Sequence, residues 1–411
     1  MLGWELPPHN SGGLGVACYN LSKALAGQGV DIDFVVPYAA THEEIKFMNV
    51  LSATQLDPLF RYGGGAYESK NVEKAIIHDT VSNRKMSLRD VQHNYCQFIE
   101  EYLEKCKKLG FPDAVHAHDW LTFEAGIIAK KKYGLPLIAH VHATEFDRSG
   151  MRGGNPLVHS IEAEALQMAD KIIAVSQATK RIIHEKYDIP LDKIDVAYNS
   201  LDEDFFTHEY HYDENEYKYL ENLRHQGYTI VSTVGRLTIQ KGMWHLLHAA
   251  KKALQQNPKL IFVLAGDGEE RDELLELTAN LGITSNVIFT GWVRGKQCRD
   301  IYSVSDVFVM SSISEPFGLT ALEAAHHDNA LILTKQSGVA EVLHAAMVYD
   351  YWDEQKLADQ IIAIASHKSL HHELCQGVRH EYRRISWDDV AQKCVQVYNK
   401  VQKKHRRRKH H

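Results

Sequence analysis

One stretch of the sequence, TIVSTVGRLTIQKG at residues 229–242, contains the unit from which the predicted fold is built. A β-branched run at 229–233 predicts a strand, a glycine-containing turn follows at 235–238, and 240–242 opens a helical stretch. A short apolar strand followed directly by a helix is typical of a parallel sheet that helices cover on both faces. The stretch therefore predicts an α/β fold.

The same alternation runs through both halves of the chain. Further strands are predicted at 31–36, 114–117, 137–141, 171–175 and 194–197 in the first half and at 260–264, 286–289, 306–309 and 331–333 in the second. A chain of 411 residues is too long for one compact core, since single domains usually have roughly 100–200 residues. We therefore predict two doubly wound α/β domains.

A polar segment at 207–227 marks the predicted junction, because it lacks an apolar strand and precedes a new βα series. This places an N-terminal Rossmann-like domain at 1–206 and a C-terminal Rossmann-like domain at 207–385. Six of the 46 lysines and arginines gather at 403–411, which we treat as a separate basic tail. Such a tail is either a solvated terminus or a site of weak contact with anionic lipid or an anionic polymer.

The composition excludes several classes of protein. With 44% hydrophobic and 24% charged residues, the chain resembles an ordinary soluble enzyme and not a disordered or fibrous protein. A net charge of −7 gives no overall basic field, so we expect no nucleic-acid partner. Residues 1–5 lack the cationic start of a secretory signal, and no run of about 20 apolar residues predicts a membrane span. We expect a cytoplasmic protein.

The six cysteines are scattered, with no C-x-x-C pair and no spacing typical of metal ligands. This pattern favours reduced thiols in the core over disulfides or a zinc site.

A glycine-rich loop, PPHNSGGLG, lies near the start at 7–15 and leads into a predicted helix from Val16. Glycines allow backbone N–H groups to approach a phosphate at a helix N-terminus, although a plain turn is the alternative. The third glycine of a dinucleotide fingerprint would fall at Cys18. The loop therefore argues against a dehydrogenase.

Two cations follow the first strand of the second domain. Arg236 offers a rigid fork of donors and Lys241 a compact point charge, a combination that suits a diphosphate. The alternative is a pair of solvated cations at the end of a strand.

The segment SEPFGLTALE at 314–323 follows the strand at 306–309. Pro316 predicts the start of a helix, with Glu315 in the loop before it and Glu323 inside it. A helix rises roughly 1.5 Å per residue, so Gly318 and Glu323 are expected to lie about 7–8 Å apart along the helix axis. One carboxylate could bind a sugar and the other a ribose. A phosphate would then lie between them, at the N–H groups of Gly318, Leu319 and Thr320.

These motifs resemble those of retaining nucleotide-sugar glycosyltransferases of the GT-B fold. The similarity is carried by GRL-(x)3-KG from Gly235, EPFGLT-(x)2-E from Glu315, the GGLG loop, HAHDW at 116–120 and the terminal Ser-Trp pair at 386–387. They occur in the family's order over nearly the whole chain and are most similar to glycogen/starch synthases and group 1 transferases. The resemblance implies two Rossmann-like domains facing a central cleft, with a C-terminal helix at 386–402 that returns to the first domain.

For the second domain, the resemblance implies that Arg236 and Lys241 bind the pyrophosphate. Glu315 would bind hydroxyl groups of the donor sugar, and Glu323 would bind the ribose. The phosphate-facing backbone would be that of Gly318, Leu319 and Thr320.

For the first domain, the resemblance implies that Gly12 and Gly13 face the donor phosphate. His142 would lie near the transferred sugar, and Asp119 beside the acceptor. The family's lysine two residues before the paired glycines is Asn10 here, which argues against ADP-glucose as donor and against glucan elongation.

Metal-dependent transferases use an Asp-x-Asp pair, and the chain has two, at 31–33 and 202–204. The first lies in a predicted strand, and the second matches a segment that is structural in the family. We therefore predict no cofactor and no essential metal, with charge on the leaving group neutralised by side chains and a helix N-terminus.

The predicted activity is transfer of a hexose, with glucose expected, from a nucleotide-diphosphate sugar to a saccharide or other hydroxyl acceptor. Alternatives are a glucan synthase proper, a phosphorylase-like or epimerase activity, and a non-catalytic sugar-binding protein. The presence of both Lys241 and Glu315 argues against the last. Glycine-rich loops at 61–67 and 147–156 would shape the acceptor surface.

Overall fold

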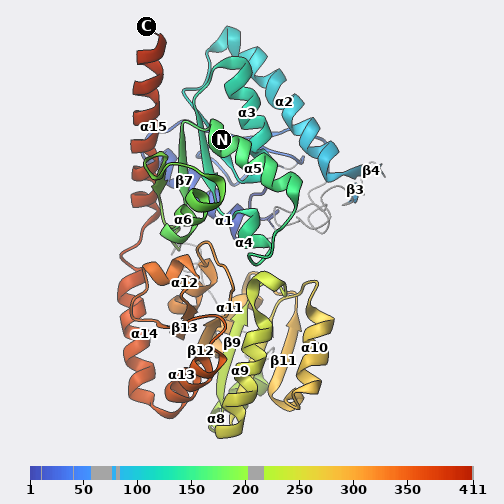
Figure 1. The fold of residues 1–411 in the computed structure, drawn as a ribbon, viewed down its shortest axis with the longest axis vertical. Helices are drawn as coiled ribbons and strands as arrows, with labels where there is room; N and C mark the ends of the chain where they lie inside the picture. The colour runs from blue at the N-terminus through green and yellow to red at the C-terminus, as the bar shows by residue number, and fades with distance from the viewer. Residues whose placement is uncertain (11, 40, 57–75, 80–83, 202–216, 410–411) are drawn as a thin grey trace. The chain divides into compact units, whose positions relative to one another are not determined.

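The computed structural model describes residues 1–10, 12–39, 41–56, 76–79, 84–201 and 217–409. The chain forms two compact units (Figure 1). Unit 1 comprises Met1–Arg148, Arg152–Asn199 and Ser386–His411, and unit 2 comprises Ser149–Met151 and Ser200–Ile385. The predicted junction at 207–227 lies partly outside the described residues, and the predicted loop at 61–67 lies entirely outside them.

Unit 1 contains two sets of parallel strands, and the first residues of the chain pair with a strand of each set. The strands are β1 (Asp33–Val36), β2 (Asn49–Ser52), β5 (Val115–His118), β6 (Leu137–Val141), β7 (Lys171–Ala174) and β8 (Ile194–Val196). β1 pairs with β2, and β5 to β8 pair in sequence order. Leu2 bridges Val35 and Ala117 in parallel, so the segment around Leu2 joins the two sets.

Neither this central segment nor β2 was predicted from the sequence, and the antiparallel pair β3 (Ile76–Asp79) and β4 (Arg84–Ser87) was not predicted either. The Leu2 N–H donates to His116 O at 2.8 Å, and the His118 N–H donates to Leu2 O at 3.0 Å. The segment is therefore extended because two neighbouring strands bind it, not because of its own composition.

The helices of unit 1 cover the strands. They are α1 (Gly13–Gly27), α2 (Leu88–Leu109), α3 (Trp120–Tyr133), α4 (Glu145–Arg148), α5 (Pro156–Met168), α6 (Gln177–Tyr187) and the 3₁₀ turn η2 (Leu191–Lys193). α1 begins three residues before the predicted Val16, because Gly12 is extended and serves as its N-cap. The predicted loop at 147–156 is shorter than expected, since it begins inside α4 and ends at the first residue of α5.

The C-terminal helix α15 (Trp387–Lys409) packs against α1 within unit 1, with its red ribbon alongside the blue and green elements of that unit (Figure 1). The Tyr398 hydroxyl lies 2.7 Å from Nδ1 of His116. The helix does not end at residue 402 but continues through the basic tail, and Lys403, Lys404 and Arg406 are exposed on it. The predicted membrane-surface contact of this tail stays a prediction. Among the described residues, no helix is long and apolar enough to span a membrane.

Unit 2 contains one parallel sheet in the order β11-β10-β9-β12-β13-β14. Its strands are β9 (Thr229–Val234), β10 (Leu260–Ala265), β11 (Val287–Gly291), β12 (Val307–Met310), β13 (Ala330–Thr334) and β14 (Met347–Tyr349). After β9 the chain adds β10 and β11 on one side, and it then returns to add β12, β13 and β14 on the other side. A doubly wound sheet binds its ligand beside the strands at which this order reverses, so β9 and β12 define the expected position of a site.

The helices of unit 2 bury apolar faces against this sheet. They are α8 (Lys218–His225), α9 (Met243–Gln256), α10 (Arg271–Asn280), α11 (Lys296–Val304), α12 (Leu319–His326), α13 (Glu354–Ser366) and α14 (Lys368–Tyr382). Short 3₁₀ turns lie at η3 (Ile239–Lys241), η4 (Thr284–Asn286) and η5 (Gly338–Glu341). The α/β fold with two doubly wound units is confirmed, and β14 is the strand of unit 2 that the sequence analysis missed.

Candidate active site

The segments that follow β9 and β12 lie against each other at the point where the strand order of unit 2 reverses. The Ile313 N–H donates to Gln240 O at 2.8 Å, and the Ser311 hydroxyl donates to Lys241 O at 2.8 Å. Gly242 has φ of 62°, and a Cβ at this position would lie 2.2 Å from Ser311 O. Only glycine permits this approach, which places Lys241 beside the loop after β12.

Lys241 and Glu315 form an ion pair in this position. Lys241 Nζ lies 2.5 Å from Glu315 Oε2, and the two side chains are 21% and 11% exposed. The Ser312 hydroxyl donates to the same carboxylate oxygen at 2.9 Å. The Glu315 backbone is also held, since its N–H donates to Gln336 O at 3.0 Å and its carbonyl accepts from the Gly338 N–H at 2.9 Å. The carboxylate is therefore fixed on a rigid edge of the sheet.

Arg236 lies directly after β9 and is half-buried. A Cβ at the preceding Gly235 would lie 3.7 Å from Cε of Lys241, so the two predicted cations flank the same turn. The turn is supported by Gly266 and Gly268, where an added Cβ would lie 1.9 Å from Gly235 O and 2.3 Å from Leu237 O. These two glycines were not identified from the sequence, although their position just after β10 was a usable signal.

The helix that carries Glu323 starts later than predicted. It begins at Leu319 and not at Pro316, because Gly318 has φ of 110°, outside the right-handed helical region. Phe317 is instead tied to the neighbouring segment, its carbonyl accepting from the Val339 N–H at 2.8 Å. The first turn of α12 has no acidic residue and no side-chain cap within the described part of the chain. Its N–H groups, beginning at Leu319 and Thr320, and its dipole therefore favour an anion.

Glu323 lies inside α12, as predicted, and is half-buried. The Tyr302 hydroxyl, on α11, donates to its Oε2 at 2.9 Å. Burial raises the pKa of Glu323 above its usual range, and the bond from Tyr302 opposes that effect. Tyr302 was not identified from the sequence, because its pairing with Glu323 depends on how two helices meet.

In unit 1, Asp119 and His142 come together at the ends of β5 and β6. Asp119 is the N-cap of α3 with φ of 59°, and it is 3% exposed. Its Oδ1 accepts from the N–H of His142 at 2.6 Å and from that of Ala143 at 3.3 Å. Burial raises the pKa of Asp119 to about 7. The carboxylate therefore positions the loop that carries His142.

A buried ion cluster holds the same loop from its other side. Arg148 Nε donates to Glu145 Oε2 at 3.1 Å, its guanidinium also pairs with Glu162, and it donates to Ala143 O at 2.9 Å. All three charged side chains are nearly fully buried. This cluster was missed from the sequence, since Glu162 lies on α5 and meets the Glu145–Arg148 pair of α4 only in the folded chain.

Four histidines from β5, from β6 and from the loop after β6 stack on one another. Ring centroids of neighbouring members of the stack lie between 4.3 and 5.2 Å apart, and the members are His116, His118, His140 and His142. His116 Nε2 lies 3.1 Å from His140 Nδ1, and His118 Nδ1 lies 2.9 Å from His142 Nε2. Burial lowers the pKa of all four, that of His142 to about 3. The four imidazoles are therefore neutral near pH 7.

The predicted phosphate loop opens α1. Gly12 is its extended N-cap, and Gly13 is its first residue. Asn10 Nδ2 donates to Gly12 O at 2.9 Å, so the residue in place of the family's lysine closes the loop on itself.

Of the first Asp-x-Asp pair, Asp31 is exposed before β1 and Asp33 makes contacts within the fold. Asp33 begins β1, where it accepts from Asn49 Nδ2 at 2.9 Å and from the Tyr102 hydroxyl. The second pair, at 202–204, lies outside the described residues.

Two family models match most of the chain. Residues 11–205 match the model of the family described as Glycosyltransferase Family 4, and residues 218–380 match that described as Glycosyl transferases group 1. The chain belongs to the group 1 glycosyltransferases.

The sequence of this group 1 glycosyltransferase is 27% identical to that of an uncharacterised glycosyltransferase from Methanocaldococcus jannaschii, with 97% of each chain covered. It is 26% identical to a glycogen synthase from Mycobacterium tuberculosis, covering 84% of this chain and 79% of the relative. Among solved structures, the catalytic domain of starch synthase IV from Arabidopsis thaliana, bound to ADP and acarbose, has a TM-score of 0.73 at 18% identity, with 98% of each chain covered. This likeness confirms the GT-B fold.

The raised pKa of Glu323 leads to a pH prediction for the group 1 glycosyltransferase. The resemblance implies that Glu323 accepts hydrogen bonds from ribose hydroxyls, and if it does, nucleotide binding favours the ionised carboxylate and releases its proton. Affinity for a nucleoside diphosphate should rise with pH through the raised pKa and fall below it. Glu323→Ala should weaken binding by about 10–100-fold, as expected for a hydrogen bond to a charged group, and should remove this pH dependence.

Calorimetric titration between about pH 5 and 8 measures both effects. The control is Glu276→Ala, which removes an exposed glutamate of α10. Equal affinity in the Glu323→Ala and wild-type proteins would exclude the ribose role.

Proposed function

We propose that this group 1 glycosyltransferase transfers a hexose, with glucose expected, from a nucleotide-diphosphate sugar to a saccharide or other hydroxyl acceptor, with retention of configuration and without an essential metal. The observation that carries the proposal is the 2.5 Å pair of Lys241 and Glu315 where the strand order reverses, with Arg236 on the same turn. Lys241, which would bind a phosphate, and Glu315, which would bind sugar hydroxyls, therefore lie next to each other.

The ion pair suggests how the two side chains act. When a diphosphate binds, Lys241 transfers its contact from Glu315 to a phosphate oxygen, and Glu315 accepts hydrogen bonds from sugar hydroxyls instead. Arg236 and the N–H groups at Leu319 and Thr320 add positive potential where charge grows as the nucleoside diphosphate leaves. Fixed donors of this kind need no rearrangement during bond cleavage.

Retention is proposed to proceed by attack on the face from which the nucleotide leaves. Both carboxylates considered as nucleophiles are engaged, Glu315 with Lys241 and Asp119 with the loop after β6. The bond from the anomeric carbon to the phosphate breaks, the acceptor oxygen bonds to that carbon, and the departing phosphate oxygen takes the acceptor's proton. A glycosyl group trapped covalently on either carboxylate would contradict this route.

The roles in unit 1 stay predictions. The resemblance assigns Gly12 and Gly13 to the donor phosphate, His142 to the transferred sugar and Asp119 to the acceptor side. The geometry of unit 1 gives Asp119 an additional positioning role, because its carboxylate binds the backbone of His142.

Metal independence has a direct expected result. Transfer should retain full activity in excess chelator, because cationic side chains and a helix N-terminus replace the divalent ion. The measurement is release of nucleoside diphosphate with EDTA present from purification onward. If the chelator abolishes activity and manganese restores it, transfer requires a divalent ion and the proposed metal independence is wrong.

The donor is identified by a thermal-shift panel of UDP-, ADP- and GDP-sugars, followed by release of the diphosphate with each stabilising donor. A donor present at 100 times its Kd stabilises the protein by about 2.7 kcal/mol. The similarity to a glycogen synthase supports glucose, whereas Asn10 disfavours glucan elongation. Glucan products would favour the synthase alternative. Binding without any diphosphate release would favour a non-catalytic sugar-binding protein.

A further inference from the structure

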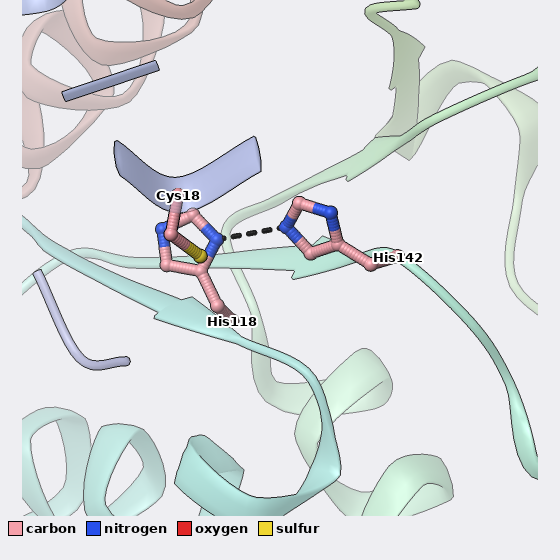
Figure 2. Close-up of side chains that lie close together, drawn as sticks. All are labelled: Cys18, His118 and His142. Carbon is pink, nitrogen blue, oxygen red and sulfur yellow. Dashed lines mark hydrogen bonds between the residues drawn. The ribbon is translucent and has the colours of Figure 1, made fainter. Parts of the chain in front are cut away.

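Three potential metal ligands from distant parts of the sequence meet inside unit 1. Cys18 lies on α1, His118 ends β5 and His142 follows β6. One ligand atom from each lies within 4.8 Å of the other two. Figure 2 shows the thiol beside the His118 ring, with a hydrogen bond between the two imidazoles.

We propose that unit 1 binds a zinc-type divalent cation through Cys18, His118 and His142, with a fourth position left for water or another ligand. A thiolate with two imidazoles is a ligand set that suits Zn²⁺ and Co²⁺ and disfavours Mg²⁺ or Ca²⁺. The site requires small adjustments, because ligand atoms on a tetrahedral zinc ion are about 3.3–3.6 Å apart. His118 Nδ1 and His142 Nε2 are now 2.9 Å apart and must separate slightly.

The surroundings of the three ligands favour a cation. Cys18 is fully buried, and its burial together with the nearby carboxylates of Asp119 and Glu5 raises the pKa of its thiol, so the thiolate would form only with a cation bound beside it. Thiolate and nearby carboxylate charge would offset the two positive charges of the ion.

Proton balance is also simple. Of the described atoms, His118 Nε2 and His142 Nδ1 are buried without a hydrogen-bond partner. The hydrogen bond between His118 Nδ1 and His142 Nε2 holds one imidazole proton between the two rings. Metal binding requires this proton to move to the outer nitrogen of its own ring, which frees both facing nitrogens for the metal. Binding then releases one proton, that of the Cys18 thiol.

A second grouping, His116, His118 and His140, is a weaker candidate. It has no anionic ligand, and His116 already contacts both His140 and Tyr398. The thiolate therefore favours the set with Cys18.

Metal binding would have a consequence for catalysis that rests on the proposed function. An ion at His142 removes this imidazole from the transferred sugar, so the cation would inhibit transfer and a chelator would relieve the inhibition. The metal site itself does not depend on that role, and its test uses no activity measurement.

The test is titration of the chelator-treated, full-length protein with Co²⁺, followed by absorption spectroscopy. A thiolate bound to Co²⁺ produces charge-transfer absorption in the near ultraviolet, which histidine-only sites, including those of a histidine-rich terminus, do not. We expect this band to saturate at one equivalent and to disappear when Zn²⁺ is added. Cys18→Ala should abolish the band, whereas Cys394→Ala, which removes another fully buried thiol, should preserve it.

A second variant keeps the proposal testable if Cys18→Ala does not fold. His142→Ala should weaken Co²⁺ binding by at least about tenfold, since even outer contacts of metal ligands contribute that much. The proposal is overturned if wild-type protein shows no charge-transfer band, if Cys18→Ala retains it, or if His142→Ala binds with unchanged affinity.

Discussion

Lys241→Ala should lower the rate of transfer by about 10²–10³-fold, the size of effect seen when one preorganised donor to a developing charge is removed. The structure adds a second consequence, because the variant leaves the 11% exposed Glu315 carboxylate without its cation. Part of the loss should therefore appear as weaker donor binding and part as a lower kcat. Arg236→Ala should cost a similar factor, since the proposed function has Arg236 neutralise the same leaving group. Steady-state release of nucleoside diphosphate measures both variants.

The matched control is Lys252→Ala, which breaks another lysine–glutamate pair of unit 2, that of Lys252 and Glu354 at 3.0 Å. This control should keep wild-type activity, because the pair joins the later part of α9 to the start of α13 and includes no residue of the segments after β9 and β12. Thermal unfolding of each variant shows whether the fold is retained. Unchanged kinetics in a folded Lys241→Ala protein would refute the assignment of the phosphate site.

Glu315→Ala should reduce transfer by on the order of 10³-fold or more, because the sugar then lacks the fixed acceptor for its hydroxyls. Affinity for the nucleoside diphosphate alone should change by only a few-fold, since the phosphate and ribose contacts do not involve this carboxylate. The expected signature is a large loss in kcat with nearly intact product binding. Calorimetry with the diphosphate and single-turnover kinetics with the sugar donor separate the two quantities.

Glu354→Ala serves as the control for this variant, because it removes the carboxylate of the other lysine–glutamate pair. If Glu315→Ala instead abolishes diphosphate binding and leaves kcat intact, then Glu315 holds Lys241 in place and does not contact the sugar. Such a result would reassign the carboxylate from catalysis to positioning.

The local elements of this fold were predictable from the sequence. β9 and β10 were found within one residue, because buried parallel strands are continuous apolar runs that differ from the amphipathic helices around them. The late start of α12 was not predicted. Pro316 is compatible with a helix start, but the pairing of Glu315 with Ser337, before η5, and the bend that follows delay the helix until after Gly318.

Motif order in the sequence determined the α/β class, the division into two βα series and the residue types expected at a diphosphate site. Tertiary structure alone decided which of them meet: the Lys241–Glu315 pair, 74 positions apart, the Tyr302–Glu323 bond, and the grouping of Cys18 with His118 and His142. The physical reason is that secondary structure reflects periodicity within a few residues, whereas side-chain contacts depend on how parallel strands are ordered. The order of the strands brings strand ends that are far apart in the sequence to one edge of a sheet, and no local sequence pattern indicates which strand ends will be neighbours.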